Sequence, residues 1–282
     1  MVTLIRKTAE LVSARAPETS PVGFVPTMGN LHAGHISLLE RALREFDTVY
    51  FSIFVNPKQF GPNEDFTRYP RTLENDLALI EASGAKFQGK RIIVYSPESS
   101  EVYPEGQGQT VEVLGVTTDL EGALRPGHFA GVATVVHRLF ELVRPTVAYF
   151  GLKDYQQYLV IRQMVADLCL PVKIIGMPIV REPSGLALSS RNQYLSAEER
   201  QQGLVLSQTL RKIVDLIRTK RDLREAKALS AEALRDPRWN YLEIRDAETL
   251  STDTRRSKNL TVLGVFQLGT TRLLDNMQVE LP

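Results

Sequence analysis

The sequence predicts an α/β protein in which a doubly wound parallel sheet is followed by a smaller α+β unit. Along about the first 180 residues, β-rich runs alternate with helical patterns, and the alternation then stops. The length of 282 residues also favours about two domains. We therefore expect a sheet domain over residues 1–180 and a smaller domain over 181–282, divided within about 180–185.

The first elements form a strand, a helix and a strand. Residues 21–27 are a short apolar run, and residues 36–46 place apolar side chains at a 3.6-residue period. Residues 47–55 are a second β-rich run, bounded by Asn56-Pro57. A βαβ unit of this kind predicts parallel strands.

The same alternation continues through the rest of the expected sheet domain, after a polar loop over 58–71. Its predicted helices cover 73–82, 131–144 and 154–168. Its predicted strands cover 91–95, 110–116, 145–150 and 172–177.

The smaller domain begins with helices and ends with strands. Ser196–Glu199 has the pattern of a capping box, which opens a helix. Its predicted helices cover 197–219 and 223–235, and its predicted strands cover 239–246, 260–268 and 271–275.

Composition narrows the class of protein. The 33 acidic and 34 basic residues nearly cancel, so no global field attracts nucleic acid or a membrane. No apolar stretch reaches the roughly 18 to 20 residues that cross a bilayer, and we expect no secretory signal. The single cysteine, Cys169, forms no intrachain disulfide, which favours a cytoplasmic location; we expect it to be buried and inert.

Two of the four histidines, His32 and His35, stand in one loop between the first strand and the following helix. A helix N-terminus attracts phosphate, and glycines such as Gly29 and Gly34 permit close approach of the backbone. The pair therefore suits contacts to a triphosphate. A packed core pair and a metal site are the alternatives, although His-x-x-His lacks the i, i+4 spacing of the common zinc motif and no acid or cysteine lies nearby.

Three further clusters hold polar groups that suit a ligand. Lys153-Asp154 follows a predicted strand, Ser189–Asn192 offers hydroxyls and a guanidinium, and Asn56 and Gln59 follow another strand. Each also has a plain structural interpretation: helix capping, a polar hinge and a turn begun by Asn-Pro. Together, the histidine loop, Lys153-Asp154 and Ser189–Asn192 predict a small-molecule site on the two sides of a cleft between domains.

The two remaining histidines point less clearly to a site. We expect a structural or wall role for His128, which precedes a helix and could also reach the site or cap that helix. His137 lies inside the helix and is expected to pack or face the surface.

Six segments together resemble one family, and the likeness covers essentially the whole chain. Thr27–His35 carries the His-x-Gly-His motif of the nucleotidyltransferase superfamily. The other segments that resemble the pantoate–β-alanine ligase family are Phe54–Phe60, Arg68–Thr72, Arg125–Phe129, Lys153–Gln157 and Ser189–Asn192.

The resemblance implies an ATP-dependent ligation in a Rossmann-like domain with a C-terminal lid domain. Pantoate is adenylated with release of pyrophosphate, and β-alanine then displaces AMP to form pantothenate. It also implies Mg²⁺ with the triphosphate, small-molecule substrates rather than nucleic acid or membrane, and a homodimer.

The resemblance also implies roles for individual residues. The catalytic residues are His35, as proton donor, His32 and Lys153. Gln59 and Gln157 bind pantoate, and Gln59 and, more weakly, Asn56 bind β-alanine. The residues implied in ATP binding are Met28, Gly29, Asn30, Leu31, His32, Ala33, Gly34, His35, Gly151, Leu152, Lys153, Asp154, Val180, Leu188, Ser189, Ser190 and Arg191.

Three positions depart from the family pattern: Leu152, Lys58 and Leu188. Leu152 puts a side-chain contact to ATP in doubt, and Lys58 places an unexplained charge near the pantoate site. Two alternatives to the ligase remain: another His-x-Gly-His nucleotidyltransferase, which would need basic residues where Gln59 and Gln157 stand, and a non-catalytic ATP-binding module.

Overall fold

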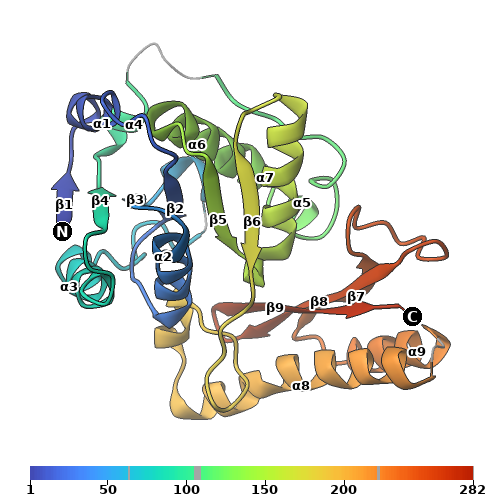
Figure 1. Cartoon of the computed structure of the whole chain (residues 1–282). Helices are drawn as coiled ribbons and strands as arrows, with labels where there is room; N and C mark the ends of the chain where they lie inside the picture. Colours follow the sequence, from blue (N-terminus) through green and yellow to red (C-terminus); the bar gives the residue numbers. More distant parts are fainter. Residues whose placement is uncertain (63, 105–108, 221–222, 282) are drawn as a thin grey trace. The chain divides into compact units, whose positions relative to one another are not determined.

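A computed structural model describes residues 1–62, 64–104, 109–220 and 223–281. It divides into two compact units. The first contains Met1–Leu152 and Val160–Met177, and the second contains Lys153–Leu159 and the chain from Pro178 onward (Figure 1).

The first unit is built on a six-stranded sheet whose pairings are all parallel. The strand order is β1-β4-β3-β2-β5-β6, which confirms the expected doubly wound sheet. The strands are β1 (Val2–Ile5), β2 (Gly23–Thr27), β3 (Thr48–Ile53), β4 (Arg91–Tyr95), β5 (Val147–Gly151) and β6 (Lys173–Met177).

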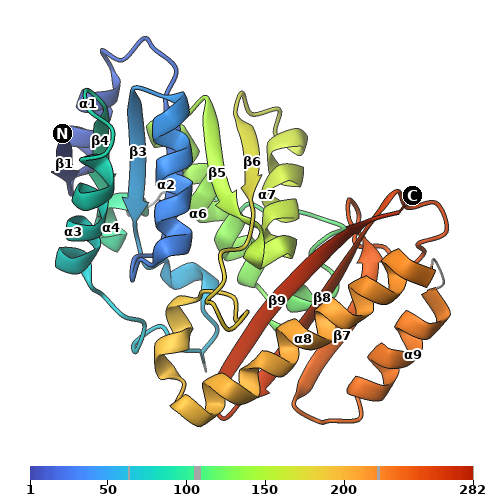
Figure 2. The same cartoon turned by 60° about the horizontal axis from the view of Figure 1, so that its bottom comes forward.

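Helices cover both faces of this sheet. In Figure 2, α2 and α3 lie on one face, and α1 and α6 lie on the other. The helices are α1 (Thr8–Arg15), α2 (Ala33–Glu45), α3 (Leu73–Gly84), α4 (Ser99–Val102), α5 (Glu121–Leu124), α6 (His128–Val143) and α7 (Tyr155–Asp167), with 3-10 turns η1 (Pro57–Gln59) and η2 (Leu152–Asp154). The division between the two units falls inside α7, after Leu159.

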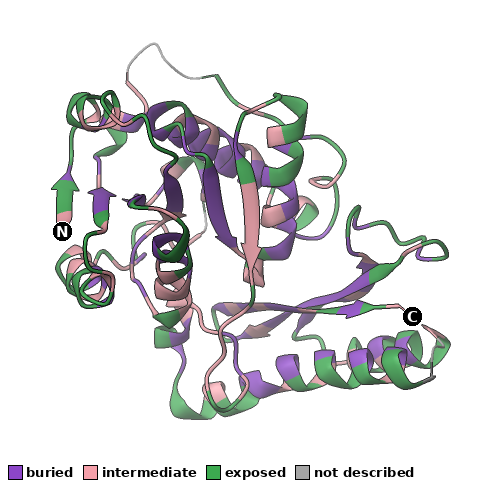
Figure 3. Ribbon diagram, viewed as in Figure 1, coloured by how far each residue is buried: buried purple, intermediate pink, exposed green. Residues whose placement is uncertain are grey.

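Burial explains why the inner strands show no regular alternation of apolar and polar residues. Every residue of β3 is buried, and Phe24, Tyr50 and Tyr149 are completely enclosed (Figure 3). Strands covered on both faces lose the polar alternation of a half-exposed sheet. The helical side of this core contains Leu39 and Leu43 of α2, which the 3.6-residue period predicted.

The order of strands creates a switch point between β2 and β5. From β2 the chain builds outward through β3 and β4, whereas β5 and β6 extend the sheet on the other side of β2. Open α/β sheets bind ligands at such a point, beyond the carboxyl ends of the strands. The loops that leave it begin after Thr27 and Gly151.

Residues 110–116, predicted as a strand, belong to no sheet, so this prediction is wrong. The backbone N–H of Val111 donates to Oγ1 of Thr134 at 2.9 Å instead of a neighbouring strand. Gly115 then adopts a left-handed φ of 82°. Val113 is the only buried residue of this segment, so the alternation of residue types in the sequence does not correspond to a half-buried strand.

The expectation that Cys169 is buried is also wrong, because its side chain is exposed. Cys169 follows α7 in a left-handed conformation with φ of 50°, and its N–H donates to Ala166 O at 3.2 Å. The tight turn places the thiol on the surface. Among the described residues, none of the helices is both long and apolar enough to span a membrane.

The second unit packs two helices against a three-stranded antiparallel sheet, β7-β8-β9. Its elements are η3 (Ser190–Tyr194), α8 (Ala197–Lys220), α9 (Leu223–Ala233), β7 (Trp239–Asp246), β8 (Asn259–Leu268) and β9 (Thr271–Glu280). The predicted capping box is confirmed, since Ser196 N donates to Glu199 Oε2 at 2.8 Å and Glu199 N to Ser196 Oγ at 3.1 Å.

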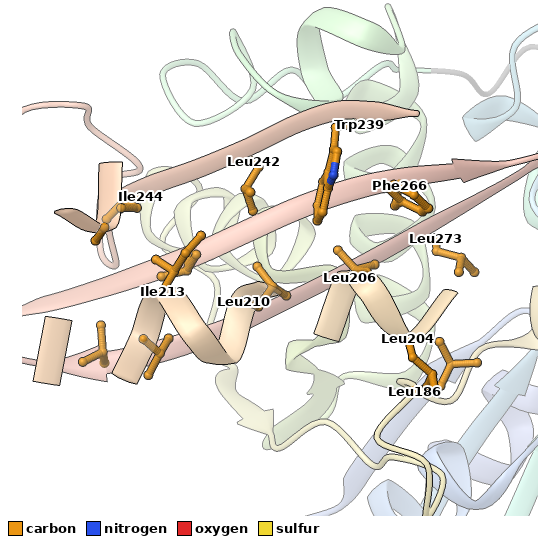
Figure 4. Close-up of a cluster of buried hydrophobic side chains, with 14 of the residues drawn as sticks. Leu186, Leu204, Leu206, Leu210, Ile213, Trp239, Leu242, Ile244, Phe266 and Leu273 are labelled. Carbon is orange, nitrogen blue, oxygen red and sulfur yellow. The ribbon is translucent and has the colours of Figure 1, made fainter. Parts of the chain in front are cut away.

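One cluster of apolar side chains holds the second unit together (Figure 4). Trp239 meets Phe266 edge to face at 5.0 Å between ring centroids, and Leu210 and Ile213 of α8 are completely buried against the sheet. Strand β9 extends to Glu280, five residues beyond its predicted end at Asp275, because Val279 still reaches this core.

Candidate active site

The loop after β2 turns the chain from the strand into α2. Gly29 and Asn30 take left-handed φ values of 84° and 51° in succession. Thr27 supports the turn, because its Oγ1 accepts from Gly29 N at 3.2 Å and donates to Ser52 O at 2.7 Å. Glycine takes the first left-handed position without steric strain, and asparagine is among the residues that tolerate the second.

The two histidines form a reciprocal cap on α2. His32, at the N-cap, accepts a hydrogen bond at Nδ1 from Gly34 N at 3.1 Å. His35 accepts one at Nδ1 from His32 N at 3.3 Å, and the two ring centroids are 4.1 Å apart. This is a capping box built from imidazoles instead of a hydroxyl and a carboxylate.

The cap fixes the tautomer of both rings. A backbone N–H can only donate, so Nδ1 of each histidine is an acceptor, and the neutral ring carries its proton on Nε2. Each ring therefore offers an Nε2–H donor even when it is uncharged. The first turn of α2 contains no acidic residue, so no side chain of the helix itself offsets the positive end of its dipole. This arrangement favours an anionic ligand such as phosphate over a metal ion.

Asn56 and Gln59 lie on the turn η1, after β3, and the structure brings Gln59 to Met28. Nε2 of Gln59 lies 3.2 Å from the sulfur of Met28 in the first loop. Asn56 donates both amide hydrogens within the protein, to Gln59 Oε1 and to Gly131 O, each at 3.1 Å. Tyr103 donates to Asn56 Oδ1 at 2.8 Å. The side chain of Asn56 is thus engaged in holding Gln59.

His128 holds the main chain of the same turn. Arg125 donates to Nε2 of His128 at 3.0 Å, and because a guanidinium cannot accept, the proton of the neutral ring is on Nδ1. Nδ1 then donates to the main-chain oxygen of Gln59 at 2.8 Å. Burial first, and then the charge of Arg125, lower the pKa of His128 to about 4, so the ring is neutral near pH 7. The structural role expected for His128 is confirmed, whereas the cap on α6 is not formed by its side chain.

Arg125 is in turn anchored by Glu64. Two hydrogen bonds, of 2.7 and 2.6 Å, join the guanidinium to the carboxylate. Burial alone would raise the pKa of Glu64, but the hydrogen bond and charge of Arg125 outweigh it and lower the pKa. His137, farther along α6, is half-buried.

Lys58, one of the residues that depart from the family pattern, contacts Tyr103. Its Nζ lies 4.2 Å from the centroid of the Tyr103 ring, in a cation–π contact. Tyr103 is the residue that also donates to Asn56, and burial raises the pKa of its hydroxyl. Neither Tyr103 nor Glu64 stands in a motif with a local signature, so the sequence alone does not point to either residue.

In the second unit, Lys153 and Ser189 both line one small pocket. The pocket is lined by Lys153, Leu186, Ala187, Ser189, Leu206, Leu273, Leu274 and Asp275. Oγ of Ser189 accepts from Arg191 N at 3.3 Å and caps η3. The main-chain oxygen of Lys153 accepts from Asn276 at 2.9 Å, and Nζ of Lys153 lies 3.8 Å from the exposed Asp154.

Two other predicted ATP contacts of the second unit, Val180 and Leu188, are joined by a backbone hydrogen bond. Leu188 N donates to Val180 O at 3.0 Å. Gln157 is half-buried in the first turn of α7, and Ser190 and Arg191 lie in η3. In the first unit, Gly151 ends β5 and Leu152 follows it.

A histidine-capped helix at the switch point of a parallel sheet defines a nucleotide-binding α/β enzyme of the His-x-Gly-His class. The model of the pantoate-β-alanine ligase family matches residues 1–278. The chain belongs to the pantoate–β-alanine ligase family.

Relatives and solved structures agree across the whole chain. A pantothenate synthetase of Roseiflexus sp. (strain RS-1) is 49% identical over 98% of this chain and 99% of its own. A crystal structure of the pantothenate synthetase from Thermus thermophilus has a TM-score of 0.91 at 47% identity, covering 98% of this chain and 99% of that one. The ligase from Francisella tularensis, complexed with β-γ ATP and β-alanine, has a TM-score of 0.77 at 33% identity, covering 98% and 97%.

Proposed function

We propose a division of an ATP-dependent ligation among the residues of this chain. As a member of the family, the chain joins pantoate to β-alanine through pantoyl adenylate and releases AMP and pyrophosphate. The observation that carries the assignment of residues is the imidazole capping box of His32 and His35 at the sheet's switch point.

In the first step, a carboxylate oxygen of pantoate attacks the α-phosphorus of ATP, and the bond to the β-phosphate breaks. His32 and His35 donate from Nε2 to phosphate oxygens while negative charge grows on the departing pyrophosphate. Their Nδ1 atoms are engaged with the backbone, which supports a role for Nε2. His35 serves as the proton donor of this pair.

Lys153 contributes a positive charge to the same step and is proposed to contact phosphate, while Asp154 contacts the ribose. Ser189, Ser190 and Arg191 add hydroxyl and guanidinium donors. The remaining proposed ATP contacts are Met28, Gly29, Asn30, Leu31, Ala33, Gly34, Gly151, Leu152, Val180 and Leu188. We propose that residues 1–180 bind nucleotide and pantoate, and that residues 181–282 act as a lid.

In the second step, the amine of β-alanine attacks the acyl carbon of pantoyl adenylate, and AMP leaves. Gln59 and Gln157 are proposed to bind pantoate, and Gln59 also to line the path of β-alanine. The contact between Gln59 and Met28 supports this, because Met28 belongs to the proposed ATP loop. Asn56, whose amide hydrogens are engaged, contributes to β-alanine binding by holding Gln59.

Mg²⁺ is proposed to enter with ATP as part of the substrate. Among the described residues, no group of three His, Cys, Asp or Glu side chains gathers as a ligand set. Mg²⁺ typically takes phosphate oxygens and water with few protein carboxylates, and such a donor set fits this chain. We further propose that the enzyme is a cytoplasmic homodimer, in keeping with its single cysteine and with the family.

Exchange of pyrophosphate into ATP tests the proposal. We expect exchange only when pantoate is present, and release of AMP when β-alanine is then added. Exchange with a nucleotide-phosphate acceptor in place of pantoate would indicate a different nucleotidyltransferase. ATP binding without any exchange would indicate a non-catalytic module.

A further inference from the structure

Asp76 is a buried carboxylate to which the proposed ligation assigns no role. It lies in the first turn of α3, and its side chain is completely inaccessible to solvent. Burying a carboxylate is unfavourable unless hydrogen bonds compensate for the lost hydration. The partners of Asp76 therefore indicate what the residue does.

Both carboxylate oxygens accept from the backbone of the loop that precedes His32. Oδ2 accepts from Asn30 N at 2.9 Å, and Oδ1 accepts from Leu31 N at 2.8 Å. Oδ1 also accepts from Oγ1 of Thr72 at 3.1 Å, at the N-cap of the same helix. The carboxylate thus joins α3 to two consecutive peptide groups of a loop 45 and 46 residues earlier in the chain.

Two consecutive N–H groups point at one anion only when the backbone is turned in a particular way. Here the left-handed φ values of Gly29 and Asn30 produce that turn, and the resulting concavity of N–H groups attracts an anion. A Cβ at Gly29 would lie 3.0 Å from Oδ2 of Asp76, so the loop has closed tightly on the carboxylate. The bound anion is a side chain of the protein itself.

The loop that Asp76 holds leads directly into the imidazole cap. Leu31 is buried in the core, and the next residue, His32, is the N-cap of α2. The direction in which His32 leaves Leu31 determines whether His32 N reaches Nδ1 of His35. The carboxylate of Asp76 fixes the peptide groups immediately before this point.

We propose that Asp76 is a positioning residue of the ATP site: by binding the backbone N–H groups of Asn30 and Leu31, it sets the geometry in which His32 and His35 cap α2. The proposal rests on the proposed function for its kinetic consequence. Its structural consequence, a single Nε2–H tautomer on each histidine, is independent of that function.

Substitution of Asp76 should change both the imidazole tautomers and the ATP concentration needed for half-saturation. Asp76→Asn keeps the size of the side chain but turns one acceptor oxygen into an NH₂ group facing a backbone donor. We expect the ATP concentration for half-maximal pyrophosphate exchange to rise about tenfold, the change that corresponds to losing one hydrogen bond to a charged group. The half-saturating pantoate concentration should change less than about threefold, a shift of under 1 kcal/mol.

The matched control lies on the same helix. Ser83 is 2% exposed, and its Oγ donates to Glu40 at 3.2 Å, away from the loop. Ser83→Ala should lower stability without changing half-saturation by ATP. A purely structural Asp76 would behave in the same way.

A milder pair of variants keeps the test available if Asp76→Asn does not fold. Thr72→Val removes the hydroxyl that orients Oδ1, while Thr72→Ser keeps it. We expect Thr72→Val to raise the half-saturating ATP concentration, as Asp76→Asn does. Thr72→Ser should keep the value of the unmodified chain.

The ¹⁵N shifts of the imidazoles provide the readout that does not depend on activity. The chain has four histidines, so His32 and His35 can be assigned with single variants. We expect Nε2–H tautomers in the unmodified chain and mixed tautomers in Asp76→Asn. Unchanged tautomers and unchanged ATP saturation in folded Asp76→Asn would overturn the proposal. Absence of pantoate-dependent exchange in the unmodified chain would instead contradict the proposed function, and the tautomers would still test Asp76.

Discussion

His128 donates its Nδ1 proton to the main-chain oxygen of Gln59 at 2.8 Å, with its other ring nitrogen held by Arg125. The bond places a buried neutral histidine behind the glutamine that is proposed to bind pantoate and β-alanine. It makes the position of Gln59 depend on a residue 69 positions away in sequence.

Replacing His128 should therefore impair the use of pantoate and β-alanine more than the use of ATP. His128→Leu removes the donor to Gln59 and leaves its carbonyl without that partner, which costs about 1–3 kcal/mol. We expect about tenfold higher KM values for pantoate and β-alanine. His128→Asn is the control, because an amide nitrogen at the δ position can still donate to Gln59. Equal KM values in the two variants would contradict this role.

Acid should destabilise the folded chain through His128. Because its folded pKa is about 4 and its unfolded pKa about 6.5, the unfolded chain binds a proton between these values that the folded chain does not. Stability is therefore fully present above pH 6.5 and falls as the pH drops towards 4, by at most about 3 kcal/mol. Urea titrations at pH 7 and pH 4.5 measure the difference. His128→Leu should lose this part of the pH dependence, and a variant that keeps it would contradict the assignment.

The two nitrogens of each capping histidine should have separable roles. In His35→Asn the amide oxygen can still accept from His32 N, as Nδ1 does, but no donor remains at the position of Nε2. In His35→Gln the longer amide can place a donor near the position of Nε2, and Gln is also a usual residue at this position of a capping box. We expect His35→Gln to retain more adenylation than His35→Asn. Asn should reduce pyrophosphate exchange by about 10²-fold or more, as for removal of one transition-state donor. Greater activity in His35→Asn would show that the cap, and not Nε2, limits the reaction.

A methyl group at Gly131 should separate α6 from the turn that carries Gln59. A Cβ at this position would lie 2.2 Å from Lys58 O and 2.7 Å from Gln59 N, both backbone atoms. We expect Gly131→Ala to destabilise the chain by about 1–3 kcal/mol or more and to lower ligation further than stability explains. Gly89→Ala is the control, because it adds a left-handed strain at φ of 78° but meets no atom within 4 Å. Thermal unfolding and ligation rates of the two variants check this, and similar losses of activity in both would argue against a role for the contact.

Much of the fold could be predicted because its signals are local. The period of apolar residues in α2 and the β-rich run of β3 indicate which faces are covered, and each signal appears within about a dozen residues. Strand β1 was not predicted because it has only four residues and two of them are exposed, and helix α1 was not predicted because Leu11 is its only buried residue. An edge strand with so little burial has no distinctive pattern, and its pairing with β4 is made some 90 residues away in sequence.

The sequence by itself determined the parallel sheet, the helix that His32 opens and the membership of the family, because periodicity, capping and motif are properties of short segments. The tertiary structure decided how that motif is held. Asp76 reaches the loop from α3, and Arg125 and Glu64 reach Gln59 through His128. A buried carboxylate or imidazole is stable only where the fold supplies its hydrogen-bond partners, and those partners come from distant elements that only the folded chain brings together.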